Sequence, residues 1–274
     1  MITNIGGSID QRGDNPESQI LFPFWNLYLC AVEERLDKIL IQRKLVSTRV
    51  RAEQIIRETG VRVDGKLITK TGKKFPIDCK IELLEEELPW VSRGALKLIE
   101  AIDKWKPEIS GKTFMDIGAS TGGFTEILLH HDVAKVYCVD VGKDQLHPKI
   151  KSNPKVINLE RTHVRELTTR LIPELVDGCV IDVAFISLEK IFPCIHSFLK
   201  KDAVVIALVK PQFEVGKENI SKGGIVKKKA LYKEVIDNVK AKALLNNLKY
   251  IDHIDSPILG GDGNQEFLML LSKI

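Results

Sequence analysis

The sequence predicts a doubly wound α/β sheet that follows a small α+β module. From residue 113 to the end, short apolar runs alternate with helix-like stretches, which is typical of parallel strands joined by helices. Between residues 33 and 60, two short helical patterns precede strand-like triplets on both sides of Asp64-Gly65, a preferred pair for a tight hairpin turn. Pro89-Trp90 interrupts both patterns and separates the two parts.

These patterns divide the chain into four segments. Residues 1–32 begin with a polar, turn-rich tail, and we expect a poorly ordered extension there. The small module is expected at 33–87 and a linker at 88–92. The α/β domain is expected at 93–274, a length sufficient for one hydrophobic core.

Each element of the small module has its own local signal. Apolar residues recur at helical spacing in 33–45 and again in 49–59. The triplets 61–63 and 66–68 form the hairpin, and 80–84 adds a further strand. The positions expected to face this core are Leu36, Ile39, Leu40, Leu45, Ala52, Ile55 and Ile56.

In the α/β domain, an amphipathic helix is expected at 92–105, before the first strand. The last two strand-like runs have no clear helix between them, which predicts an antiparallel pair at the edge of the sheet. The expected strands are 113–117, 135–141, 156–159, 179–186, 204–209, 250–254 and 267–271.

The positive charge of the chain is concentrated in one stretch. Residues 31–80 hold 13 Lys and Arg against 7 Asp and Glu, whereas residues 81–274 balance at 27 against 27. An excess confined to fifty residues indicates a polyanion as partner. The alternative is that these basic residues form a solvated helical face and bind no polyanion.

Composition disfavours several other classes of protein. The five cysteines are an odd number without a Cys-x-x-Cys spacing, which argues against a disulfide framework or a metal site. No segment reaches the roughly 18–20 apolar residues that span a bilayer, and no export signal is recognised. We expect a cytoplasmic protein with no metal ion and no membrane partner.

The ten residues that begin at Met115 carry the most specific local pattern. Asp116 closes an apolar strand, Gly118 opens a loop, and Gly122-Gly123 begins a helix. This spacing differs from G-x-G-x-x-G, which admits a pyrophosphate, so a nicotinamide oxidoreductase is disfavoured. An acid beside bare backbone suits a cofactor with a carboxylate and an ammonium, such as S-adenosylmethionine. The alternative is an ordinary tight turn.

Two lysines and two carboxylates are expected at the carboxyl edge of the sheet, where open α/β sheets bind ligands. A lysine directly after an apolar strand is costly to place unless it has acidic neighbours or a task. The arrangement suits methyl transfer to a sugar hydroxyl, a weak nucleophile that needs a general base. The alternative is four strand-end charges that reach solvent. The candidate catalytic residues are Lys97, Asp182, Lys210 and Glu266.

Basic residues alternate with the buried positions of the small module and are expected on the outer faces of its two helices. Such faces bind phosphates. Aromatic residues are absent between Ala31 and Lys74, so recognition of structured RNA fits better than stacking on a single strand. The candidate RNA-binding residues are Arg35, Lys38, Arg43, Lys44, Arg49 and Arg57.

Glu34-Arg35-Leu36-Asp37 and 61–66 resemble the S-four RNA-binding module. The α/β domain resembles the FtsJ-type ribose methyltransferases, and residues 33–274 together resemble the TlyA family, which joins the two. The matching stretches are 90–94 with Lys97, 116–124, 139–142, 185–188, 210–214 and 261–267.

The resemblance implies a Rossmann-like methyltransferase sheet and S-adenosylmethionine-dependent 2′-O-methylation of cytidine ribose in ribosomal RNA, with ribosomal RNA or a ribosomal subunit as partner. It implies that Lys97, Asp182, Lys210 and Glu266 form a catalytic tetrad. The cofactor contacts implied are Asp116, Gly118, Ser120, Gly122 and Asp140.

The chain departs from the family pattern at Ala95-Leu96, His163 and Ala184, and none of these is a candidate catalytic residue. A non-catalytic RNA-binding assembly factor is an open alternative. TlyA relatives are often labelled haemolysins, but without a spanning segment a membrane-lytic protein is disfavoured.

Overall fold

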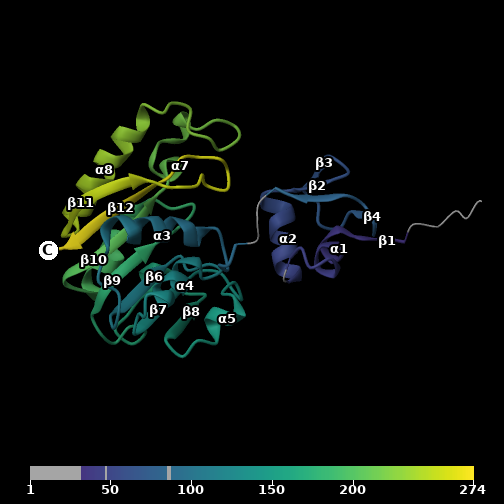
Figure 1. The fold of residues 1–274 in the computed structure, drawn as a ribbon. Helices are drawn as coiled ribbons and strands as arrows, with labels where there is room; N and C mark the ends of the chain where they lie inside the picture. Colours follow the sequence, from purple (N-terminus) through teal and green to yellow (C-terminus); the bar gives the residue numbers. More distant parts are fainter. Residues whose placement is uncertain (1–31, 47, 85–87) are drawn as a thin grey trace, which may run out of the picture. The chain divides into compact units, whose positions relative to one another are not determined.

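The computed structural model describes residues 32–46, 48–84 and 88–274 (Figure 1). It contains two compact units that divide between Leu84 and Glu85, and each has a hydrophobic core of its own. Residues 1–31 of the expected extension lie outside the described residues.

The smaller unit packs two short helices against short antiparallel strands. One sheet has the strand order β3-β2-β5, and β1 pairs separately with β4. Its core consists of all the predicted inward positions except Leu45, which is half-buried, together with strand residues such as Val61 and Val63. The elements are β1 (Glu33–Arg35), α1 (Leu36–Gln42), α2 (Arg49–Glu58), β2 (Val61–Val63), β3 (Lys66–Ile68), β4 (Lys74–Pro76) and β5 (Ile81–Leu83).

Local chemistry explains these boundaries. Thr48 caps α2, since its side chain accepts a hydrogen bond from the backbone N–H of Arg51. Asp64 and Gly65 have φ of 49° and 78°, the positive pair that a tight two-residue hairpin turn requires. Residues 33–35 form a strand rather than the start of a helix, because they pair with β4, a three-residue strand too short to be recognised from its pattern.

The larger unit is a seven-stranded sheet with the order β11-β12-β10-β9-β6-β7-β8. Strands β6 to β10 are parallel, and β12 runs antiparallel to both β10 and β11, which confirms the expected edge pair. The strands are β6 (Thr113–Ile117), β7 (Lys135–Asp140), β8 (Val156–Glu160), β9 (Val176–Ile181), β10 (Leu199–Val209), β11 (Leu248–Asp255) and β12 (Phe267–Lys273).

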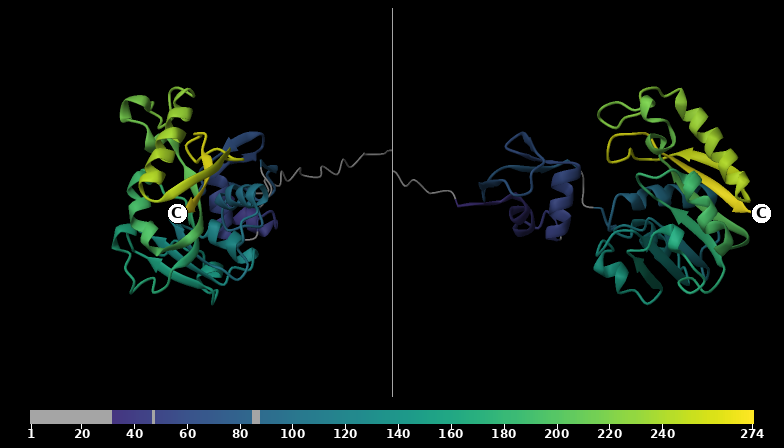
Figure 2. Two further views of the ribbon diagram at one scale, coloured as in Figure 1. Left: turned by 90° about the vertical axis from the view of Figure 1, so that its left-hand side faces the viewer. Right: turned by 180° about the vertical axis from the view of Figure 1, so that it is seen from behind.

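Helices cover both faces of this sheet (Figures 1 and 2). On one face, α3, α4 and α5 bury residues such as Leu98, Ile127 and Ile150 against the strands. On the other face, α6 and α8 bury Phe192 and Val239. The sheet is therefore doubly wound, as predicted. The helices are α3 (Gly94–Trp105), α4 (Gly123–His130), α5 (Pro148–Lys151), α6 (Phe192–Ile195), α7 (Pro211–Glu214) and α8 (Leu231–Leu245).

The strand predicted at 179–186 ends five residues earlier than expected. β9 stops at Ile181, so Asp182 lies directly after the strand rather than within it. The backbone N–H of Asp182 still donates to the Ile117 carbonyl, but Phe185 has a φ of 64° and cannot continue an extended chain. This early end lets residues 182–187 form a loop at the carboxyl edge of the sheet.

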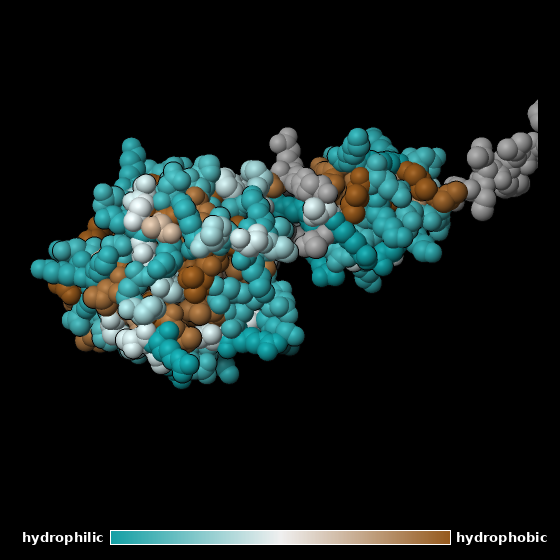
Figure 3. Space-filling model, turned by 90° about the horizontal axis from the view of Figure 1, so that it is seen from below, coloured by the Kyte–Doolittle hydropathy of each residue, from teal (hydrophilic) through white to brown (hydrophobic). Residues whose placement is uncertain are grey.

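The exposed surface is largely hydrophilic in the view of Figure 3, with hydrophobic residues gathered mainly on the larger unit. Within the described ranges, we find no helix with the length and apolar character needed to cross a bilayer.

Candidate active site

Sheet topology brings three predicted residues to one edge. Val209 of β10 pairs with Phe267 of β12, so Lys210, which follows one, and Glu266, which precedes the other, flank the same register position. Asp182 follows β9, the next strand in the order. Because β12 is antiparallel to β10, its first residues lie at the carboxyl edge. Strand ends alone therefore gather one lysine and two carboxylates.

Lys97 completes this group from α3. Its Nζ donates to Glu266 Oε2 at 2.5 Å, and the side chains are only 10% and 3% exposed. On the amphipathic helix α3, Lys97 shares the buried face with Ala95 and Leu98. The second carboxylate oxygen of Glu266 faces Gly260, where any side chain would occupy its place. A buried ion pair of this kind is costly to assemble, so its geometry must be well supported.

Lys210 forms a second ion pair, with Asp182. Lys210 Nζ lies 2.6 Å from Asp182 Oδ1, and both side chains are largely but not completely buried. The other oxygen of Asp182 would lie 3.8 Å from a Cβ at Gly94, the first residue of α3. Asp182 therefore lies near the start of the helix that carries Lys97. The structure thus brings the four residues together as two adjacent lysine–carboxylate pairs.

The glycine loop lies against the same residues. Gly118 has a φ of 84°, and a Cβ there would collide with the backbone carbonyl of Asp182. Gly122 has a φ of 93° and precedes α4. A Cβ at Gly123 would collide with the hydroxyl of Ser92. Each glycine is thus required by conformation or by close approach, and the loop keeps bare backbone beside Asp182.

Asp116 is completely buried beneath this loop. Thr125 Oγ1 donates to Asp116 Oδ2 at 2.6 Å, while no described group donates to Oδ1. Burial raises the pKa of Asp116 to about 7, the nearby Asp182 charge adds to the rise, and the Thr125 hydrogen bond opposes it. Because this carboxyl is buried, it could attract a cationic group bound above the loop only through its charge and not by direct contact.

Asp140 ends β7 and is half-exposed. Its Oδ2 accepts from the backbone N–H of Ser120 at 2.8 Å, and its Oδ1 accepts from Gly142 N–H at 2.7 Å. Each carboxylate oxygen has a further lone pair, which can accept from a ribose hydroxyl. The loop, the orphan oxygen of Asp116 and this fixed carboxylate together fit S-adenosylmethionine.

Two features of the site were not predicted. Glu214, at the end of α7, accepts from Ser187 Oγ at 2.7 Å and from Leu188 N–H at 2.9 Å, which ties the segment after Lys210 to the loop after Asp182. Burial raises the pKa of Glu214. Phe185 is 90% exposed, and its ring lies 5.3 Å from that of Phe213. Each of these two residues lies within four positions of a predicted catalytic residue in the sequence. This spacing is the only sequence feature that could have identified them.

In the smaller unit, most of the predicted RNA-binding residues have intramolecular partners. Arg35 and Arg49 converge on the buried Asp37 at 2.8 Å and 3.3 Å. Arg43 donates to the backbone carbonyls of Ile77 and Cys79 and therefore holds the unit together. Lys38, Arg57 and Lys44 have exposed side chains, and the first two form ion pairs with Glu34 and Glu53.

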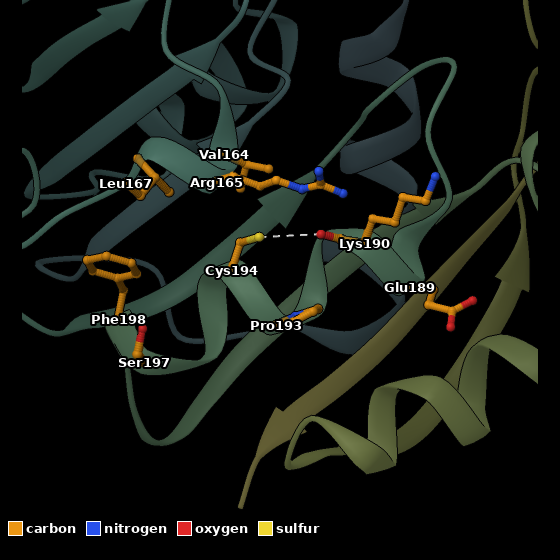
Figure 4. A pocket seen from close by; sticks show the side chains of 9 residues that line it. All are labelled: Val164, Arg165, Leu167, Glu189, Lys190, Pro193, Cys194, Ser197 and Phe198. Carbon is orange, nitrogen blue, oxygen red and sulfur yellow. Dashed lines mark hydrogen bonds between the residues drawn. The ribbon is translucent and has the colours of Figure 1, made fainter.

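A separate pocket of about 610 Å³ lies elsewhere on the larger unit (Figure 4). The Cys194 thiol within it donates to the Lys190 carbonyl at 3.3 Å. None of the predicted site residues lines this pocket, so it is distinct from the carboxyl-edge site. Its lining residues are Val164, Arg165, Leu167, Glu189, Lys190, Pro193, Cys194, Ser197 and Phe198.

Comparison with protein-family models divides the chain in the same way. Residues 90–273 match the model of the FtsJ-like methyltransferases, and residues 34–76 match that of the S4 domain.

Relatives of known name cover most of the chain. The 16S/23S rRNA (cytidine-2′-O)-methyltransferase TlyA of Mycobacterium tuberculosis is 37% identical over 86% of this chain and 89% of its own length. Hemolysin A of Brachyspira hyodysenteriae is 33% identical over 85% of this chain and 98% of its own length. The solved structure of a candidate hemolysin from Streptococcus thermophilus is 36% identical, covers 89% of each chain and gives a TM-score of 0.70. The chain therefore belongs to the FtsJ-like methyltransferase family, in the TlyA group, and carries an S4 domain before its methyltransferase domain.

Proposed function

We propose that this protein transfers a methyl group from S-adenosylmethionine to the ribose 2′-hydroxyl of a cytidine in ribosomal RNA. The observation that carries the proposal is the pair of lysine–carboxylate contacts, Lys97–Glu266 and Lys210–Asp182, beside the glycine loop. The names of the TlyA relatives support cytidine and ribosomal RNA as the substrate. Because ribosomal RNA is the substrate, we place the activity in the cytoplasm.

The cofactor would lie on the loop between β6 and α4. Gly118, Ser120 and Gly122 would offer backbone to its amino-acid end, and Asp140 would accept from its adenosine hydroxyls. Asp116 has no exposed surface, so we assign it an electrostatic role beneath the loop. The bound cofactor supplies a methyl group on a positively charged sulfur. The remaining chemistry is that of the protein's own residues.

Lys210 would act as the general base. In its neutral form, its Nζ accepts the proton of the 2′-hydroxyl as the oxygen attacks, and Asp182 stabilises the ammonium that forms. Lys97, held by Glu266, places a fixed positive charge at the same edge, where negative charge develops on the oxygen. Glu214 positions the loop of Asp182 relative to Lys210 through its two hydrogen bonds.

Residues other than the two lysine–carboxylate pairs would also bind the RNA. The S4 domain presents exposed arginines and lysines on its helices, and such side chains bind the phosphates of structured RNA. At the catalytic edge, the exposed ring of Phe185 offers an aromatic face for an unstacked base.

The test is transfer of tritiated methyl from labelled cofactor to ribosomal RNA from cells that lack this protein. Wild-type protein is expected to label the RNA, and Lys210→Ala is expected to lose about 10²–10⁴-fold in rate. The matched control is Lys201→Ala, an exposed lysine at the opposite edge of the sheet. If neither naked RNA nor either ribosomal subunit is labelled, the protein is a binding factor rather than an enzyme.

A further inference from the structure

The segment between α7 and α8 is strongly basic. Residues 216–230 contain five lysines and a single acid, Glu218, although residues 81–274 as a whole carry no net charge. The side chains of all five lysines are exposed. We call this segment the lysine loop. Its lysines are Lys217, Lys222, Lys227, Lys228 and Lys229.

Hydrogen bonds give the lysine loop a defined shape. Ile220 and Val226 form an antiparallel bridge, and Ser221 N–H donates to the Ile225 carbonyl at 2.8 Å. Gly224, with a φ of 81°, allows the turn between them. Lys227 Nζ donates to the Glu218 carbonyl at 2.6 Å and so helps to close the loop. The exposed lysines therefore project from an ordered scaffold.

The lysine loop is attached to the catalytic edge at two points. Its first residue comes two positions after Glu214, in the segment that follows Lys210. Asn264, only 1% exposed and two residues before Glu266, accepts from Val226 N–H at 3.0 Å and donates to the Gly224 carbonyl at 2.9 Å. Figures 1 and 2 show the segment before β12 beside the segment between α7 and α8. Both catalytic lysine–carboxylate pairs are thus linked to this loop.

We propose that the lysine loop binds backbone phosphates of the substrate RNA next to the nucleotide to be methylated. This inference rests on the proposed function. Three or more ammonium groups on an ordered loop match the repeated phosphates of a nucleic acid strand, and each neutralised phosphate releases counterions. The attachment through Asn264 would keep the bound strand in register with Lys210 and Glu266. Basic charge outside the S4 domain would then orient the RNA, while the S4 domain adds affinity.

The test removes three charges without disturbing the scaffold. The variant Lys222→Gln, Lys228→Gln, Lys229→Gln spares Lys227, whose ammonium holds the loop closed. The control variant Lys201→Gln, Lys249→Gln, Lys273→Gln removes the same charge where β10 and β11 begin and β12 ends, at the opposite edge of the sheet. Binding to undermethylated ribosomal RNA is measured from 50 to 300 mM salt, in the Lys210→Ala background and without cofactor.

The loop variant is expected to lower the slope of log affinity against log salt by about 2–3, since each lost phosphate contact contributes about 0.7–0.9. The control is expected to keep the wild-type slope.

Two results would overturn the inference. The first is an unchanged salt slope in the loop variant. The second is a loop variant that keeps its affinity for RNA but no longer binds phosphatidylserine vesicles. Failure of the proposed function is distinguishable, because wild-type protein would then bind the RNA with the expected salt slope but would not label it.

Discussion

The carboxyl-edge site and the helices of the S4 domain differ in how far their ion pairs are exposed. In the carboxyl-edge site, the side chains of Lys97 and Glu266 are 10% and 3% exposed. In the S4 domain, Arg49 and Arg57 are 56% and 67% exposed, although both pair with Glu53. The carboxyl-edge site buries its lysine–carboxylate pairs, whereas the S4 helices carry exposed ones.

The difference follows from what each charge must do. An exposed ion pair contributes about 0–1 kcal/mol, so its arginine can exchange a carboxylate for a phosphate at small cost. A buried pair loses hydration that only good geometry offsets, and neither partner can leave without a large penalty. Exposed ion pairs therefore suit the binding of a polyanion. Buried ion pairs suit a site whose charged groups must stay in place.

Asp37 combines the two situations. Its carboxylate is buried, but Arg35 and Arg49, which face it, are partly exposed. Burial alone would raise the pKa of Asp37, yet the Arg35 hydrogen bond and the two arginine charges hold it below its usual value. This acid orders two arginines at the surface without removing them from solvent.

The largest expected effect is on the enclosed pair. Lys97→Met leaves Glu266 buried without its ammonium partner and is expected to lower the free energy of unfolding by about 3–5 kcal/mol. Adding Glu266→Gln should recover most of that stability but no methyl transfer. Urea unfolding of both variants, with Arg57→Gln as the exposed counterpart, measures the contrast. If Lys97→Met lowers the free energy of unfolding by less than about 1 kcal/mol, burial does not make the Lys97–Glu266 pair important for stability.

Substitution of Glu214 tests whether a half-buried carboxyl acts only by positioning other residues. Glu214→Ala removes the acceptor of Ser187 and Leu188 and is expected to lower kcat about 10²-fold, because small displacements of catalytic groups have effects of that size. KM for the cofactor should not change. Glu214→Gln keeps an acceptor oxygen and should restore most of the rate. Glu218→Ala, an exposed acid in the lysine loop, is the control. Equal kcat for the Ala and wild-type proteins would refute the positioning role.

Asp116 should make stability depend on pH. Burial raises its pKa from 3.8 to about 7, so the folded chain keeps a proton that the unfolded chain has released. Stability of the unliganded protein should therefore fall as pH rises from about 4 to about 7, by at most about 1.4 kcal/mol per pH unit, and then level off. Asp116→Asn should flatten the curve, and Asp132→Asn, an exposed position, should not. Thermal unfolding across this range measures the effect, and parallel curves for all three proteins would disprove it.

The smallest effect on stability is expected in the S4 domain. Arg49→Gln should change the free energy of unfolding by less than about 1 kcal/mol, because the Arg49 side chain is exposed and the buried Asp37 keeps Arg35 as its partner. It should nevertheless lower the salt slope of RNA binding by about 1. Lys66→Gln, on the hairpin, removes the same charge away from the helices. Identical slopes for these two variants would mean that the helix face does not contact RNA.

The predictability of the site follows from topology. Lys210 and Glu266 can be identified from the sequence because each adjoins an apolar strand, and the ends of strands in one sheet meet at a shared edge. Asp182 is identified by the same logic, although its strand ends five residues earlier than the pattern predicts. The positive φ of Phe185 that ends this strand region has no signal in a run of apolar residues.

Contacts between distant segments could not be predicted. Glu214 is 27 residues from Ser187, and Asn264 is 38 residues from Val226, and neither spacing follows from periodicity. The β1–β4 pairing also escapes prediction, since strands of three residues carry too little pattern. The lysine loop could not be recognised from the net charge of residues 81–274, because acidic residues elsewhere in this range balance its lysines.

The close approach of Gly118 to the Asp182 carbonyl has a consequence for engineering. Any side chain at position 118 would press on the backbone of Asp182, which pairs with Lys210, the proposed general base. A substitution made there to admit a bulkier alkyl donor would therefore be expected to change donor choice and reactivity together.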